Sequence, residues 1–199
     1  MFKNPIPQVT NQLQYRAIGI INGKFTPHNI EQLNRGFLID DKGEKIDTVV
    51  LGKALSLLKK HIDLKKSYYW VVYPKNKNTQ NLHLQVAGIW DPYQLNDFPN
   101  DSSKNNFSKL LEEFNLKDNY FSVRGELVFV NTKKKEIIIK ICSATKSNNS
   151  KNKNFKLVIK GELSLELLNS FVSLDVIREG NSLILLDYEV VEKNLFKNN

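Results

Sequence analysis

The order of the predicted elements constrains this chain most, because the same order occurs twice. In each half, three runs of alternating apolar and polar residues precede a helical segment and two further runs. The first set covers residues 15–25, 36–52 (two short strands around the turn Asp-Asp-Lys-Gly), 53–64, 68–74 and 82–90. The second covers 120–131, 136–144, 155–163, 164–171, 173–180 and 182–191. This order predicts a mostly β protein with minor α content, built as two small barrels in tandem.

A stretch rich in proline, asparagine and aspartate separates the two halves and predicts a linker. Within this linker, the segment NFSKLLEEFNL favours a short helix. The predicted organisation is therefore an extended lead-in, a first barrel, a linker, a second barrel and a polar tail, at residues 1–14, 15–90, 91–118, 119–191 and 192–199.

Three strands, a helix and two strands is the order of the five-stranded Greek-key barrel called the OB-fold, and the chain resembles a tandem of such folds. Aligning Gly19 with Gly125 keeps both alternations in phase, and glycine suits a first strand that bends. SH3-like and other small barrels share much of this order. The stretches YRAIGIINGKF, IDTVVLGKALSLLKKHIDL, WVVYPK and LHLQVAGIW also resemble a family of uncharacterised cyanobacterial proteins. That resemblance implies a cytoplasmic housekeeping or regulatory role and carries no catalytic residues.

The chain of 199 residues is basic, with 29 lysines and arginines, 21 acidic residues and a formal charge of +8. A basic balance favours nucleic acid or another anionic surface as the partner. The same balance also arises from a general enrichment in lysine and asparagine, so charge alone leaves both interpretations open. The first 14 residues lack the apolar core of a signal peptide, and no apolar run is long enough to span a bilayer, so a soluble cytoplasmic protein is expected.

Residues suited to catalysis do not cluster in the sequence. His28, His61 and His83 lie in a loop, a helix and a strand, without the spacing of metal ligands. Cys142 is the only cysteine, and no glycine-rich phosphate loop or nucleophile motif is present. We therefore expect a protein that is not an enzyme and that has no metal site and no cofactor.

Alternation in the second barrel divides its strands into two faces. The predicted inner face contains Phe121, Val123, Leu127, Phe129, Ile137, Ile139, Ile141, Phe155, Leu157 and Ile159. The predicted outer face contains Ser122, Arg124, Glu126, Lys140, Lys156 and Lys160. Because this face of an OB-fold is where nucleic-acid strands lie, its four cations predict a phosphate-binding surface.

The first hairpin of the second barrel ends in Lys133, Lys134 and Lys135. Clustered like charges favour an anionic ligand, yet hairpin tips are solvated, and lysines there also deter edge-to-edge association. Together with Lys140 and Lys156, this tip is interpreted as a weak contact to the nucleic-acid backbone.

Aromatic residues concentrate in the strand YYWVVYP of the first barrel. Alternation places Tyr69 with Tyr73 on one face and Tyr68 with Trp70 on the other, so one pair lies outside or is covered by the linker. Exposed aromatics stack on the bases of single strands, and Tyr69 and Tyr73 are the candidates for this role. The competing interpretation is that these aromatics seal an interface between the barrels.

The first hypothesis is a non-enzymatic protein that binds single-stranded nucleic acid, RNA or DNA, with little sequence readout. Its candidate binding residues are Arg16, Tyr69, Tyr73, Lys75, Arg124, Lys133, Lys134, Lys135, Lys140, Lys156 and Lys160. The alternative is a protein-interaction or assembly module that docks through strand 68–74. A metabolite sensor that uses the cleft between the barrels is a third interpretation. The sequence does not predict an oligomeric state.

Overall fold

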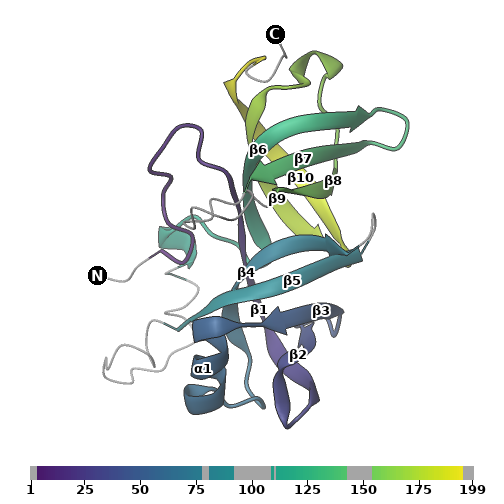
Figure 1. Cartoon of the computed structure of the whole chain (residues 1–199). Coiled ribbons are helices and arrows are strands. Elements are labelled where there is room, and N and C mark those ends of the chain that lie inside the picture. The colour runs from purple at the N-terminus through teal and green to yellow at the C-terminus, as the bar shows by residue number, and fades with distance from the viewer. Residues whose placement is uncertain (1–3, 78–80, 92–108, 110, 143–153, 195–199) are drawn as a thin grey trace, which may run out of the picture. The chain divides into compact units, whose positions relative to one another are not determined.

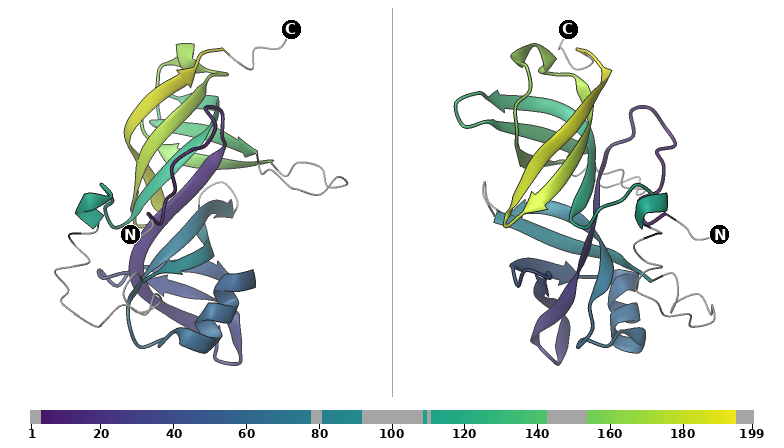
Figure 2. Two further views of the ribbon diagram at one scale, coloured as in Figure 1. Left: turned by 90° about the vertical axis from the view of Figure 1, so that its left-hand side faces the viewer. Right: turned by 180° about the vertical axis from the view of Figure 1, so that it is seen from behind.

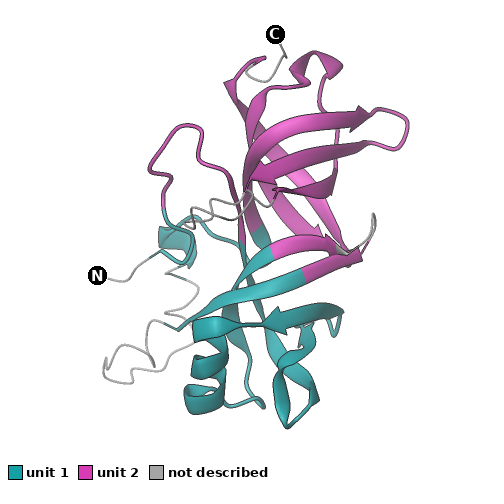
Figure 3. Ribbon diagram, in the orientation of Figure 1, with its two compact units in different colours: residues 1–7, 19–73, 84–120 teal, residues 8–18, 74–83, 121–199 magenta. Residues whose placement is uncertain are grey.

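The computed structural model describes residues 4–77, 81–91, 109, 111–142 and 154–194 (Figure 1). The chain divides into two compact units, each made of three segments (Figure 3). Unit 1 comprises residues 1–7, 19–73 and 84–120, and unit 2 comprises 8–18, 74–83 and 121–199. Within the described ranges, no helix is long and apolar enough to cross a membrane.

Unit 1 contains most of the first predicted set of elements. They are β1 (Arg16–Asn29), β2 (Gln32–Ile39), β3 (Lys45–Val50), α1 (Gly52–His61), β4 (Tyr68–Lys77) and β5 (Asn81–Trp90). The strands follow the order β2-β3-β5-β4-β1, and an additional pairing of β2 with β1 closes the sheet. The first residues of β1 and the adjoining ends of β4 and β5 belong to unit 2.

Unit 2 repeats this arrangement with the second set. Its elements are β6 (Tyr120–Asn131), β7 (Glu136–Cys142), β8 (Asn154–Lys160), the 3-10 helix η1 (Leu165–Leu167), β9 (Phe171–Glu179) and β10 (Ser182–Glu192). The order is β6-β7-β8-β10-β9, closed by pairing of β6 with β9, and β8 runs parallel to β10. Both sheets therefore have the closed Greek-key order of the OB-fold, as predicted.

Each barrel has its own apolar core. In unit 1 the largest fully buried side chains include Phe25, Leu38 and Trp70. In unit 2 they include Phe121, Leu127, Ile137, Ile139 and Phe171. The helical element between the third and fourth strands is α1 in unit 1 and the much shorter η1 in unit 2, where the Ser164 hydroxyl accepts a hydrogen bond from the Glu166 backbone N–H. Ser164 is thus the N-cap of η1.

The first strand of each barrel is buried on both faces, which the alternation did not predict. In β1, Ile18 and Ile20 are buried, and so are Ala17 and Ile21, which alternate with them on the other face. In β6, Ser122, Arg124 and Glu126 are buried as well. The physical reason is that a first strand joins both sides of a small barrel, and in unit 2 residues 8–15 also lie beside it (Figure 2).

A β-bulge in β6 reverses the orientation of its last residues. Leu127 pairs with Ile139, but Phe129 pairs with Ile138, so the register shifts at Val128. A bulge inserts one residue and moves every later side chain to the other face. The prediction that Phe129 points into the core is therefore wrong, because 45% of its surface is exposed.

Glycines in both barrels permit close backbone approaches. A Cβ at Gly125 would lie 2.4 Å from the Lys140 carbonyl oxygen in β7. In unit 1, a Cβ at Gly23 would lie 2.6 Å from the Ile39 carbonyl oxygen in β2. At both positions a side chain would clash with the backbone of the neighbouring strand, so glycine is the residue that fits.

Two predicted segments fall largely outside the described residues. The predicted linker helix lies in a stretch of which only residues 109 and 111–118 are described, and residues 109 and 111–113 are helical. The lysine- and asparagine-rich loop at 145–154 is described only at its last residue.

Candidate nucleic-acid interface

Three strands of unit 2 present three cross-strand rows of side chains on their outer face. Ile137, Ile139 and Ile141 of β7 point inward and are buried, so the alternate residues of β7 and their partners point outward. We call this surface the three-row face. Its rows are Glu126–Lys140–Lys156, Phe129–Ile138–Val158 and Asn131–Glu136–Lys160.

The first row contains two lysines, of which Lys140 forms an ion pair and Lys156 forms none within the described residues. The Lys140 ammonium donates to a Glu126 carboxylate oxygen at 2.8 Å. The hydrogen bond that Lys140 donates to Glu126 raises the pKa of Lys140, and the Glu126 side chain is only 8% exposed. Lys156 is exposed and has no ion pair among the residues that the structure describes. Lys140 therefore serves mainly to neutralise a buried carboxylate, while Lys156 is available to a ligand.

Replacing Lys140 with methionine should lower the free energy of unfolding by about 1–3 kcal/mol, because Glu126 would remain buried without its partner. Adding Glu126→Gln to that variant should recover part of the loss, since the amide carries no charge. Lys156→Met, in the same row but exposed, should change stability by less than about 0.5 kcal/mol. Urea unfolding followed by circular dichroism measures all three, and equal losses for the two lysine variants would contradict the assignment.

The second row is apolar and partly open to solvent. Phe129 is 45% exposed, and Ile138 and Val158 are half-buried. An exposed phenylalanine on a strand offers a flat surface on which a base can stack. The row thus lies between two rows that contain lysines.

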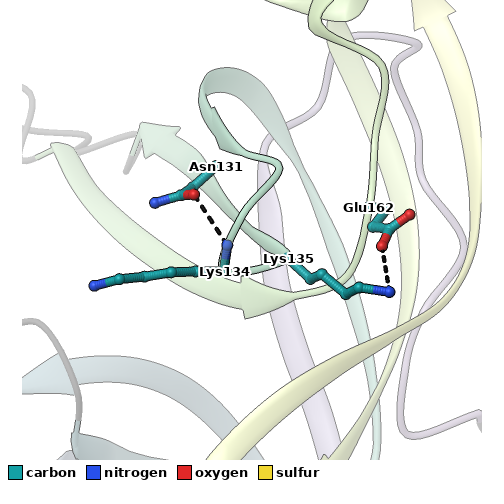
Figure 4. A network of polar contacts seen from close by, with 4 residues as sticks. All are labelled: Asn131, Lys134, Lys135 and Glu162. Carbon is teal, nitrogen blue, oxygen red and sulfur yellow. Dashed lines mark hydrogen bonds and ion pairs between the residues drawn. The ribbon is translucent and has the colours of Figure 1, made fainter.

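The third row adjoins the lysine turn at the tip of the β6–β7 hairpin (Figure 4). The Lys134 backbone N–H donates to the Asn131 side-chain oxygen at 3.0 Å, which fixes the turn. The Lys135 ammonium pairs with Glu162 at 2.6 Å, and its backbone carbonyl accepts from Gly161 N–H. Lys133 and Lys134 are exposed and carry no ion pair in the described part of the chain. Two of the three turn lysines are therefore available to an anion.

Arg16 belongs to the N-terminal segment of unit 2, residues 8–18, and Arg124 lies beneath that segment. Arg124 is 7% exposed, and its Nη2 donates to the Gln12 carbonyl oxygen at 2.6 Å. Arg16 Nη2 donates to the Ser122 hydroxyl at 2.7 Å, and the Tyr15 ring lies edge-on to Phe171. The prediction that Arg124 is exposed is wrong, because residues 8–15 cover that part of β6. Neither arginine lies on the three-row face.

The aromatic side chains of β4 alternate between two faces as predicted, but Tyr69 on the outer face is covered by another ring. Tyr68 and Trp70 are buried, whereas Tyr73 is 41% exposed. Tyr69 meets the Trp90 ring edge-on at 6.0 Å, and Trp90 in turn meets Phe114. Burial is the largest cause of the raised pKa of Tyr69. Tyr69 therefore packs within unit 1, which leaves Tyr73 as the exposed member of the predicted stacking pair.

Lys75, at the end of β4 that belongs to unit 2, is engaged with an aromatic ring. Its ammonium lies 3.0 Å from the centre of the Phe155 ring, a cation–π contact. Burial lowers the pKa of Lys75. The adjacent Asn76 accepts a hydrogen bond from the Val158 N–H at 3.0 Å through its side-chain oxygen. These contacts place the end of β4 beside β8 rather than free in solvent.

Sequence reasoning missed the apolar row and the role of Asn76. A bulge leaves no clear mark in an alternating sequence, so Phe129 could not be assigned to the outer face. Asn76 lies in a polar run, and nothing in that run distinguishes it from its neighbours. Among the described residues, no group of three or more histidines, cysteines and acidic residues is placed to hold a metal ion.

Unit 1 is a closed five-stranded barrel in the order β2-β3-β5-β4-β1, and unit 2 is one in the order β6-β7-β8-β10-β9. Two such barrels in one chain define a tandem OB-fold protein. Residues 17–97 match the family model described as PatR RNA-binding protein, N-terminal OB-fold domain. Residues 123–192 match the model described as cyanobacterial OB-fold-like RNA-binding domain, C-terminal. The two matches together cover most of the chain, so the chain belongs to these OB-fold families. The matches also confirm the predicted resemblance to cyanobacterial proteins. A search of curated proteins found no match to this chain.

Proposed function

We propose that this protein binds single-stranded RNA through the three-row face of unit 2, with little sequence readout and without catalysing a reaction. Both matching families are described as RNA-binding, which supports RNA over DNA as the ligand. The observation that carries the proposal is the exposed Phe129 between Lys156 on one side and Lys160 on the other.

The row spacing suits an RNA strand that crosses β6, β7 and β8. Outward residues on one strand are about 6.8 Å apart, since each residue rises about 3.4 Å. A strand lying along the apolar row can therefore place bases on Phe129 while its phosphates reach the lysines of the rows on either side. The turn residues Lys133 and Lys134 extend this basic surface beyond the third row.

The test is a titration of a fluorescein-labelled 12-nucleotide oligo(U) RNA with the full chain, followed by anisotropy. Phe129→Ala should weaken binding between about 5-fold and 150-fold, because stacking on an aromatic side chain contributes about 1–3 kcal/mol per base. Phe129→Tyr should retain most of the affinity, since the ring remains.

Tyr188 in β10 supplies a matched control, because this aromatic is also 45% exposed but lies outside the three-row face. Tyr188→Ala should leave the affinity unchanged within about twofold, in contrast to the loss of a stacking contact. The absence of any binding by the unmodified chain at low salt would overturn the proposal, as would equal losses for the two alanine variants.

A further inference from the structure

A pocket of about 330 Å³ opens at the third row of the face, and all of its lining residues belong to unit 2. It shares three residues with the three-row face and adds groups from the ends of β4 and β5 and from the β9–β10 turn. The lining consists of Asn76, Leu82, Glu136, Val158, Lys160, Asn181, Ser182 and Leu183. Pockets of this volume that combine apolar walls with a few polar groups are typical ligand sites.

The apolar walls are suited to the flat surface of a base. Leu82 and Leu183 are 3% and 2% exposed, so both are firmly packed, and Val158 adds a third wall from the apolar row. A base that leaves the stacked strand can lie against this wall and present its hydrogen-bonding edge to the polar groups.

Three of the polar groups, Asn76, Glu136 and Lys160, retain atoms that can hydrogen-bond to a ligand. The Asn76 side-chain oxygen already accepts from Val158 N–H, so its Nδ2 is the group left to donate. Glu136 and Lys160 are cross-strand partners, yet they form no ion pair within the described residues. These three side chains therefore supply a half-buried carboxylate that only accepts and two groups that donate, while Asn181 and Ser182 can each donate or accept.

This arrangement matches guanine better than the other bases. Guanine presents two adjacent donors, N1–H and the N2 amino group, which can meet the two oxygens of one carboxylate. Its O6 acceptor can take a hydrogen bond from an ammonium or an amide N–H. Adenine and cytosine each place a ring acceptor beside their single amino group, and uracil places its one N–H between two carbonyls. In each of these three bases a lone pair would face the carboxylate.

We propose that this pocket binds one guanine base of the RNA, with Glu136 accepting from N1–H and N2–H and with Asn76 and Lys160 donating to O6. This inference rests on the proposed RNA binding and adds one specific position to an otherwise unspecific strand.

The experiment compares four 12-nucleotide RNAs by anisotropy with the full chain: oligo(U), and oligo(U) with a single central G, A or C. The unmodified chain should bind the G-containing strand at least about tenfold more tightly than the other three, as expected for a good bidentate contact. Replacing that G with inosine, which lacks the N2 amino group, should remove most of the gain.

Glu136→Gln should lower the ratio of G-strand to oligo(U) affinity to below about threefold, because an amide cannot accept on both of its heavy atoms. Glu166→Gln, an equal charge change at an exposed residue of η1, should leave the ratio unchanged. Equal affinity for all four strands would overturn the guanine site and leave RNA binding standing. A guanine preference that survives Glu136→Gln would overturn the assignment of the pocket. Failure of all four strands to bind would overturn the proposed function itself.

Discussion

Replacing Lys156 and Lys160 together with glutamate is expected to weaken the binding of oligo(U) RNA, which has no guanine, about 25-fold or more at 0.1 M salt. Each phosphate contact to a single strand contributes about 0.7 to the slope of log K against log salt, so two lost contacts remove about 1.4 log units at that concentration. The introduced carboxylates add repulsion. Both lysines are exposed and unpaired within the described residues, so the fold should be retained.

The salt dependence of the same titration gives a second readout. The slope of log K against log salt should become shallower by about 1.4 in the double variant. The matched control is Lys53→Glu with Lys60→Glu, which makes the same charge change on the exposed surface of α1. These lysines lie near opposite ends of the helix, so their effects on the helix dipole oppose each other. Equal losses of affinity in both double variants would show that net charge, rather than the three-row face, governs binding.

Trp70→Ala should lower the free energy of unfolding by about 3–5 kcal/mol, the usual range when a fully buried large aromatic is truncated. Trp70 is 0% exposed and contacts the rings of Phe25 and Tyr68. Its Nε1 also donates to the Gly23 carbonyl oxygen at 2.8 Å, so the alanine variant leaves both a cavity and an unsatisfied acceptor. Because a domain is stable by only about 5–15 kcal/mol, this change should remove a large part of the stability of unit 1.

Tyr73, three residues later on the same strand, is the control for this prediction. It is 41% exposed, so Tyr73→Ala should change stability by less than about 0.5 kcal/mol. Urea unfolding followed by far-UV circular dichroism measures both variants. Similar stabilities for the two would contradict the division of β4 into a buried face with Trp70 and an outer face with Tyr73.

The architecture could be predicted because its signals are local and repeated. Alternation in 136–144 and 155–163 placed Ile137, Ile139, Leu157 and Ile159 in the core, where all four are buried. The order of strands and helix then gave the barrel type, since few topologies accept it twice in one chain.

The site was harder to predict because it depends on non-local events. Alternation gave Arg124 the correct side of β6, but it could not show that residues 8–15 would lie over that side. The period-two alternation placed Phe129 on the wrong face of β6, because the extra residue at Val128 depends on how β6 pairs with β7. The charge pattern likewise did not reveal that Lys140 forms an ion pair with Glu126 or that Lys75 makes a cation–π contact with Phe155. Of the predicted cations, the structure leaves Lys133, Lys134, Lys156 and Lys160 exposed and without an ion pair in its described residues.

The methyl NMR signals of Ile138 provide the most direct test of where RNA binds. Ile138 points outward in the apolar row, while its neighbours Ile137 and Ile139 are fully buried in the barrel. Addition of oligo(U) RNA to the full chain with labelled isoleucine methyls should shift the Ile138 signal far more than those of Ile137 and Ile139. Ile46 in the core of unit 1 should stay unchanged. Saturable binding that leaves the Ile138 signal in place would contradict the three-row face as the RNA-binding surface.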